Sequence, residues 1–113
     1  MPQSNFPSGY KIMWLFVFFD LPVDDRQARR DYARFRKHLL KLGFMQMQYS
    51  VYARPFPSQE AMAPYRAQIE IALPPRGAVR LLAVTDRQFG KMESYYGKER
   101  QANEKPPSQL LLF

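Results

Sequence analysis

Cysteine is absent from the 113-residue sequence, and histidine occurs once, as His38. Without cysteine the chain forms no disulfide, no zinc–thiolate site and no thiol nucleophile. A single histidine cannot form a zinc-binding cluster, and we expect His38, on the flank of a predicted helix, to be solvated. A cysteine-free chain suits a reducing compartment, so the expected location is cytoplasmic.

Long hydrophobic runs are also missing. An apolar run over residues 13–19 is closed by Asp20, and no apolar run in the sequence approaches the roughly 20 residues that cross a bilayer. Residues 1–10 are polar and contain proline, with no cluster of positive charge, so we expect a loose leader and not a secretory signal. The sequence has no glycine-rich dinucleotide motif and no P-loop. We expect no membrane partner.

Acidic residues are scarce relative to basic ones. Ten Asp and Glu stand against seventeen Lys and Arg, a formal net charge of +7, which favours a polyanionic partner such as nucleic acid. At the same time 46% of the residues are hydrophobic and 15% are aromatic, which is too many core formers for a disordered chain. The composition predicts one folded, basic domain.

Hydrophobic periodicity predicts alternating strands and helices. Residues 11–19 are apolar on both alternating faces, as in a central strand. Asp24 or Asp25 can cap a helix that runs to about Leu42 and ends at Gly43. The apolar stripe of this helix comprises Ala28, Tyr32, Phe35, Leu39 and Leu42. A strand is expected next at 45–53, followed by a break at Pro55, Pro57 and Ser58. A second helix is expected at about 59–73, and its inward residues are Met62, Tyr65, Ile69 and Leu73. A strand at 77–85 and a short strand within 89–96 follow.

This order of elements predicts an α+β, ferredoxin-like sandwich, in which a small antiparallel sheet carries two helices on one face. Whether residues 44–54 form one long strand or two short ones is left open. The expected division is a flexible leader at 1–10, a ferredoxin-like domain at 11–97 and a tail at 98–113.

Two features predict a symmetric homodimer. The first strand is apolar on both faces, although both helices are expected on one side, so sheet surface stays open. The tail also ends in an apolar strand candidate that has no obvious partner within the domain: Leu110, Leu111, Leu112 and Phe113. Stacking of two open sheet faces, with each tail added to the edge of the other sheet, satisfies both features.

A carboxylate stands where the first strand ends. Asp20 precedes a Leu-Pro turn, which would expose its side chain at the rim of the sheet as an oxygen ligand for Mg²⁺. One carboxylate is a weak magnesium site, but a two-fold axis could place two Asp20 side chains around one ion, which could activate water for attack on a phosphodiester. The alternative is a turn-forming aspartate. Ser50 and Tyr52, on the polar face of their strand, are further candidates for this site, or ordinary interface residues.

Opposite the apolar stripe, the first predicted helix carries a cluster of cations. These are Arg26, Arg29, Arg30, Arg36, Lys37 and Lys41, with Arg34 beside them. A helix that is merely solvated usually mixes Glu with Lys at i, i+4 spacing, whereas Asp31 is the only acid in this stretch. Guanidinium groups suit bidentate phosphate contacts. We predict that this face binds a nucleic-acid backbone; a solvated or protein-binding face is the alternative.

Four segments, taken together and in order, resemble one known family. They are FFDLP at 18–22, RKHLLKLGF at 36–44, QYSVYAR at 48–54 and VTDRQFGKM at 84–92. Over about residues 13–97 the chain resembles the CRISPR-associated protein two family, particularly its type II members. The resemblance implies a ferredoxin-like homodimer that bridges two dimers of the larger CRISPR integrase subunit and holds duplex DNA during spacer acquisition.

The same resemblance implies a metal-dependent endonuclease that cuts RNA or DNA. The family's magnesium-binding acidic residue corresponds to Asp20, and the family's serine, whose role is less defined, corresponds to Ser50. Basic residues that follow the duplex correspond to Arg26, Arg29 and Arg30. Three functions stay open: an architectural subunit, a Mg²⁺-dependent endonuclease acting on single-stranded RNA or duplex DNA, and an unrelated RNA-recognition-type module whose sheet aromatics stack bases.

Overall fold

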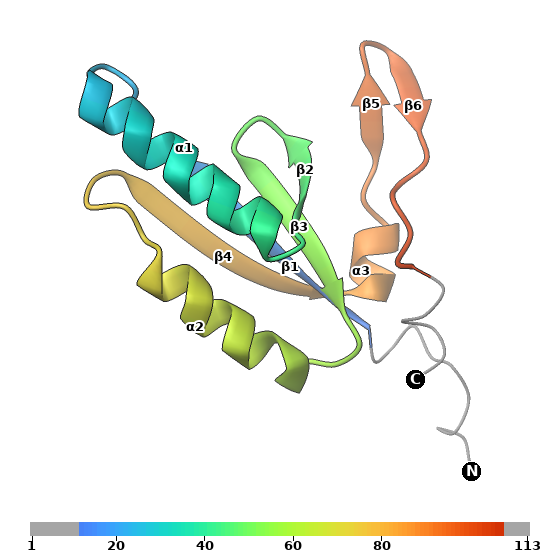
Figure 1. The fold of residues 1–113 in the computed structure, drawn as a ribbon. Coiled ribbons are helices and arrows are strands. Elements are labelled where there is room, and N and C mark those ends of the chain that lie inside the picture. The colour runs from blue at the N-terminus through green and yellow to red at the C-terminus, as the bar shows by residue number, and fades with distance from the viewer. Residues whose placement is uncertain (1–11, 108–113) are drawn as a thin grey trace.

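A computed structural model describes residues 12–107, which fold as a four-stranded antiparallel sheet with two helices on one side (Figure 1). The strands lie in the order β2-β3-β1-β4, and helices follow β1 and β3. This is the predicted ferredoxin-like α+β sandwich. The elements are β1 (Met13–Asp20), α1 (Arg26–Lys41), β2 (Met45–Gln48), β3 (Val51–Phe56), α2 (Ala63–Ile71) after a short turn of 3-10 helix (Glu60–Met62), β4 (Ala78–Thr85), α3 (Asp86–Gly90), β5 (Ser94–Tyr96) and β6 (Glu99–Gln101).

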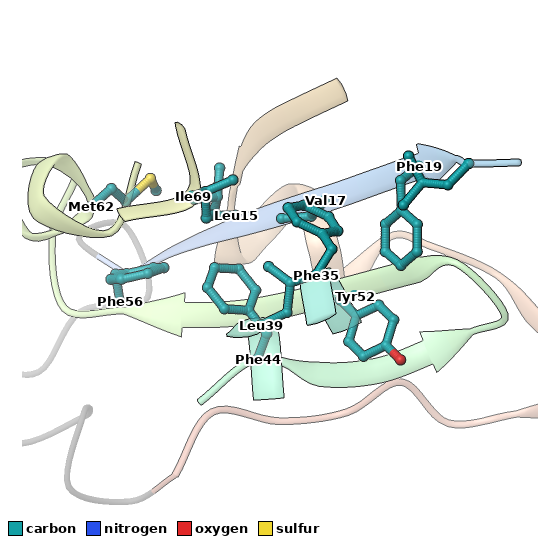
Figure 2. Close-up of a cluster of buried hydrophobic side chains, with 11 residues drawn as sticks. Leu15, Val17, Phe19, Phe35, Leu39, Phe44, Tyr52, Phe56, Met62 and Ile69 are labelled. Carbon is teal, nitrogen blue, oxygen red and sulfur yellow. The ribbon is translucent and has the colours of Figure 1, made fainter. Parts of the chain in front are cut away.

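The central strand β1 is buried on both faces, as predicted. Its odd-numbered residues, including Leu15 and Val17, face the helices, and its even-numbered residues, including Trp14 and Phe16, face the other side. The helix side holds the larger core, which joins β1 to α1, α2 and β3 (Figure 2). Its buried members are Leu15, Val17, Phe19, Leu21, Phe35, Leu39, Phe44, Tyr52, Phe56, Met62 and Ile69.

Helix α1 begins and ends where the sequence predicted. The Asp25 carboxylate accepts a hydrogen bond from the Ala28 backbone N–H at 2.7 Å, which caps the first turn. At the other end Gly43 adopts a left-handed φ of 88°, which terminates the helix. The predicted apolar stripe is confirmed, because Ala28, Phe35 and Leu39 are buried while Tyr32 and Leu42 pack against the core.

Residues 44–54 form two strands and not one. The chain turns at Tyr49 and Ser50, and Ser50 adopts a left-handed φ of 66°. A register shift between Gln46 and Gln48 accompanies this turn. The prediction that Tyr52 lies on a polar face near Asp20 is wrong. Alternation holds, with Val51 and Ala53 on the side away from the helices, but the helices cover the face that carries Tyr52, which is fully buried there.

Two further boundaries differ from the prediction. Strand β3 continues through Pro55, where a break was expected; the pairing with β2 stops at Ala53, so the missing N–H of this proline disrupts no β2–β3 bond. Helix α2 is shorter than predicted and ends at Ile71. Leu73, expected inward, therefore lies beyond the helix and is 46% exposed.

The segment after β4 contains a short helix that the sequence did not predict. Thr85 and Gln88 form a reciprocal capping box that starts α3. Strands β5 and β6 then form a hairpin beside the main sheet (Figure 1). The domain boundary expected at residue 97 falls at the turn of this hairpin. The predicted leader at 1–10 and the predicted terminal strand at 110–113 lie outside the described residues.

The sheet face opposite α1 and α2, here called the open face, is apolar. Phe89 of α3 stacks on Trp14 with ring centroids 3.8 Å apart, and the Trp14 indole N–H donates to Asp86 at 2.7 Å. Beyond this contact, a hollow of about 590 Å³ lies between the sheet and the hairpin residues, lined by side chains that include Phe16, Phe18 and Leu82. No helix within residues 12–107 is long and apolar enough to cross a membrane.

Candidate functional site

Asp20 ends β1 at the rim of the sheet, with its side chain exposed to solvent. It alternates with Phe16 and Phe18, so it belongs to the open-face side of the strand. A shallow hollow of about 210 Å³ lies beside it. The hollow is lined by Phe18, Phe19, Asp20, Tyr49, Ser50, Val51, Ala78 and Arg80. The structure thus places Ser50, one of the two further candidates for this site, in the same hollow as Asp20.

Backbone packing fixes the position of Asp20. Asp20 pairs with Ala78 at the start of β4, and the Phe19 N–H donates to the Ser50 carbonyl oxygen at 3.1 Å. Gly77, with a left-handed φ of 95°, lies so close that an added Cβ would be 2.7 Å from the Asp20 carbonyl oxygen. Only glycine fits both that conformation and that space.

Replacing Gly77 with alanine should therefore destabilise the fold at this site. We expect Gly77→Ala to lower the free energy of unfolding by about 2–4 kcal/mol, the sum of backbone strain and steric overlap. The matched control is Gly97→Ala, where φ is 67° but an added Cβ meets nothing within 4 Å; its cost should be about 1 kcal/mol. Equal losses for the two variants in urea titrations would contradict the steric argument.

Ser50 is engaged with α1. The Ser50 and Tyr32 hydroxyl groups lie 3.1 Å apart, and the Tyr49 ring stacks on the Tyr32 ring with centroids 5.8 Å apart. Burial raises the pKa of the Tyr32 hydroxyl, although the hydrogen bond with Ser50 opposes that shift. Since the Ser50 hydroxyl already contacts Tyr32, the arrangement favours a role for Ser50 in shaping the site.

The other acidic groups near α1 have structural roles. The carboxylate of Asp25 caps α1 and lies 3.4 Å from Arg76. The Ala28 N–H, supported by the Arg76 and Arg29 charges, lowers the pKa of Asp25. Asp31 is buried and accepts a hydrogen bond from Gln27 at 2.9 Å. The two ion pairs within residues 12–107, Arg34–Asp31 and Arg76–Asp25, leave Asp20 uninvolved.

A magnesium ion would find only part of its ligand set in one chain. No group of three or more Asp, Glu, His or Cys side chains gathers within the described part of the chain. Mg²⁺ usually takes one or two carboxylates and completes an octahedron with waters and phosphate oxygens. The exposed Asp20 carboxylate fits such a site as one ligand, and a second copy of the chain could supply the second.

The basic residues predicted for nucleic-acid binding all lie on the outer side of α1. Arg26, Arg29, Arg30, Lys37 and Lys41 are exposed, whereas Arg36 is half-buried. The Arg29 guanidinium donates to the Val23 carbonyl oxygen at 3.1 Å, which holds it near the start of the helix. Within residues 12–107, Arg34 is the one cation of α1 that forms an ion pair, with Asp31. The face is free to meet an anionic partner.

Sequence reasoning missed three residues around Asp20. Tyr32 was predicted only as part of an apolar stripe, and helical spacing does not predict the contact of its hydroxyl group with Ser50. Tyr49 was assigned to a continuous strand, although a turn was one of the two open alternatives for that segment. Gly77 was placed within a strand, and the signal that could have found it is its position directly after Pro74, Pro75 and Arg76, at a break in the chain.

Comparison with known proteins agrees with the resemblance of the four segments. The family model described as CRISPR associated protein Cas2 matches residues 13–92. A protein of Parvibaculum lavamentivorans, named CRISPR-associated endoribonuclease Cas2, is 48% identical over 101 residues, covering 89% of this chain and 100% of the relative. A Flavobacterium psychrophilum protein of the same name is 41% identical over 104 residues, covering 92% and 90%.

A third relative extends the match along almost all of the chain. The Rhodospirillum rubrum protein named CRISPR-associated endoribonuclease Cas2 2 is 42% identical over 111 residues, covering 95% of this chain and 99% of the relative. The segment that the family model matches, residues 13–92, includes the whole four-stranded sheet, both covering helices and Asp20. This chain therefore belongs to the Cas2 family of CRISPR-associated proteins.

Proposed function

We propose that this protein works as a homodimeric, nucleic-acid-binding subunit of the CRISPR spacer-acquisition complex, where it holds duplex DNA and bridges dimers of the integrase. The exposed basic face of α1 carries the proposal. Its cations project away from the core on a rigid helix, and net charge of the chain is +7. Such a face suits the regular phosphate array of a nucleic-acid backbone.

The dimensions of α1 suit a duplex. A helix of 16 residues is about 24 Å long, which matches the axial length of about seven base pairs. If about five phosphates are neutralised by each subunit, the logarithm of the affinity should fall against the logarithm of the salt concentration with a slope near −4.5. This contact reads the backbone and not the bases, so binding should depend little on sequence.

The open face supports the dimer. Leu82 is 51% exposed there, and the neighbouring hollow is lined by Phe16, Phe18 and Val51 among others. Two copies that stack these faces about a two-fold axis would bury this surface, while α1, on the opposite side of the sheet, would stay outward. Strand β4 lies at an edge of the described sheet, and the apolar segment 110–113 of a partner is suited to extend it.

A second activity, Mg²⁺-dependent hydrolysis of phosphodiesters, is favoured by the exposed Asp20 carboxylate and by the endoribonuclease names of the relatives. A bound Mg²⁺ would neutralise charge on the phosphodiester and acidify the attacking water. In the stacked dimer the two Asp20 side chains would approach each other and supply two carboxylates. The chain itself contributes position: β1 pairing and the close approach of Gly77 fix the Asp20 backbone.

The variant Asp20→Ala distinguishes the architectural role from the hydrolytic activity. With purified integrase partner, Asp20→Ala should integrate spacers as the unmodified protein does, because the cations of α1 and the apolar side chains of the open face are unchanged. Mg²⁺-dependent cleavage of single-stranded RNA by the same variant should fall on the order of 100-fold or more, because the metal loses its carboxylates. Loss of integration would contradict the architectural role, and unchanged cleavage would contradict the metal site.

A further inference from the structure

We propose that Tyr49 is a stacking platform for one unpaired nucleobase beside Asp20, an inference that rests on the proposed nucleic-acid binding. The ligand class is single-stranded nucleic acid, of which one base would lie on the Tyr49 ring while its backbone runs toward α1. Aromatic side chains bind unpaired bases in this way because every base presents a flat π surface.

The Tyr49 ring is exposed although it is large and aromatic. It lies at the turn between β2 and β3 and is 74% exposed. The hollow beside Asp20 includes Tyr49 among its lining residues. A base that stacks on this ring would therefore place the adjoining phosphodiester near the Asp20 carboxylate.

Neighbouring side chains hold the ring in position. One face of Tyr49 lies against Tyr32 at an interplanar angle of 23°, and Tyr32 contacts both the Ser50 hydroxyl and, edge-on, the Phe19 ring. Since Tyr49 is mostly exposed, its other face is open to solvent. A ring that is fixed on one side and open on the other loses little conformational entropy when a base stacks on it.

Dimerisation leaves this platform accessible. Tyr49 stacks on Tyr32, which belongs to α1, so its ring lies on the helix side of the sheet end. A partner that covers the open face packs on the other side. On α1, Arg29 and Arg36 flank Tyr32 at spacings of three and four residues, which places their cations along the same side of the helix. They are suited to contact phosphates next to the stacked base.

The base must be unpaired. Within a duplex both faces of a base are covered by its neighbours, so the Tyr49 ring could reach only a base at an end, in a bulge or in a single strand. The platform thus predicts a contribution to binding that depends on the presence of a base. It is separate from the charge contribution of α1, which depends only on phosphates.

Fluorescence anisotropy with a labelled single-stranded RNA ten nucleotides long tests this, in EDTA so that cleavage does not interfere. The comparison probe has the same length and charge but lacks bases along its central stretch. We expect the full-length wild-type chain to bind the base-bearing RNA about tenfold more tightly than the abasic probe, with Tyr49→Phe unchanged. Tyr49→Ala should bind both probes with the wild-type affinity for the abasic one.

Each outcome decides the proposal. Equal affinity of the wild-type chain for the two probes would overturn it, and so would a base preference that persists in Tyr49→Ala. Unchanged thermal unfolding of Tyr49→Ala separates loss of stacking from loss of folding, and Tyr49→Phe keeps the ring in either case. If abasic RNA binds with a salt slope near −3.5, as about five neutralised phosphates of a single strand predict, phosphate binding by α1 stands even where the stacking proposal fails.

Discussion

Reversing three charges on the exposed face of α1, in the triple variant Arg26→Glu, Arg30→Glu, Lys37→Glu, is expected to weaken duplex DNA binding on the order of 100-fold. Through counterion release, each phosphate contact raises the affinity about fivefold when the salt concentration is lowered from 1 M to 0.15 M. Three lost contacts give this loss, and repulsion by the new carboxylates increases it. Anisotropy titrations against a short duplex measure the change.

The salt dependence identifies the cause. With about two contacts left, the slope of log affinity against log salt should move from near −4.5 to near −1.8. A matched control reverses three other exposed cations: Arg87 on α3, Lys91 directly after α3, and Lys98 at the β5–β6 turn. This control changes the net charge equally but should change the slope little. If both triple variants lose affinity equally, net charge and not the α1 face governs binding.

Leu82→Glu on the open face is expected to convert the proposed dimer into a monomer at micromolar concentration. Two-fold symmetry places the new carboxylate in the interface twice, and each buried, unpaired carboxylate costs about 2 kcal/mol or more. The dimer dissociation constant should therefore rise on the order of 1000-fold. Because Leu82 is 51% exposed in the single chain, the variant should fold normally.

Ile71→Glu is the matched control for this experiment. Ile71 is also a large exposed aliphatic residue, 77% exposed, but it ends α2 on the opposite side of the sheet. Sedimentation equilibrium should show a dimer for the unmodified chain and for Ile71→Glu, and a monomer for Leu82→Glu. A dimer in all three cases would place the interface elsewhere.

The hydrophobic pattern was sufficient to predict the central architecture. Strand β1 alternates between two cores, and the spacing of Ala28, Phe35 and Leu39 specified one buried face of α1, so both elements followed from periodicity. The β2–β3 turn did not follow, because a serine at φ 66° replaces the glycine or asparagine that usually marks such a turn. Helix α3 was missed because five residues are too few to show a helical period.

The residues of the candidate site also differ in whether the sequence could predict them. Asp20 and the basic residues of α1 were predictable, because a carboxylate at a strand end and a one-sided set of cations are local features of the sequence. The contact between Tyr32 and Ser50 joins residues 18 positions apart, and the approach of Gly77 to Asp20 depends on the pairing of β1 with β4. Such contacts arise from tertiary packing, which periodicity does not encode.

In the proposed assembly, two chains meet through their open faces with their Asp20 residues near the two-fold axis. The chain contains no cysteine, so Asp20→Cys introduces one thiol, and Arg30→Cys introduces one on the outer face of α1. Treatment with a short bis-maleimide at micromolar protein should convert Asp20→Cys into a covalent dimer and leave Arg30→Cys monomeric. A monomeric Asp20→Cys beside a cross-linked Arg30→Cys would contradict the proposed assembly.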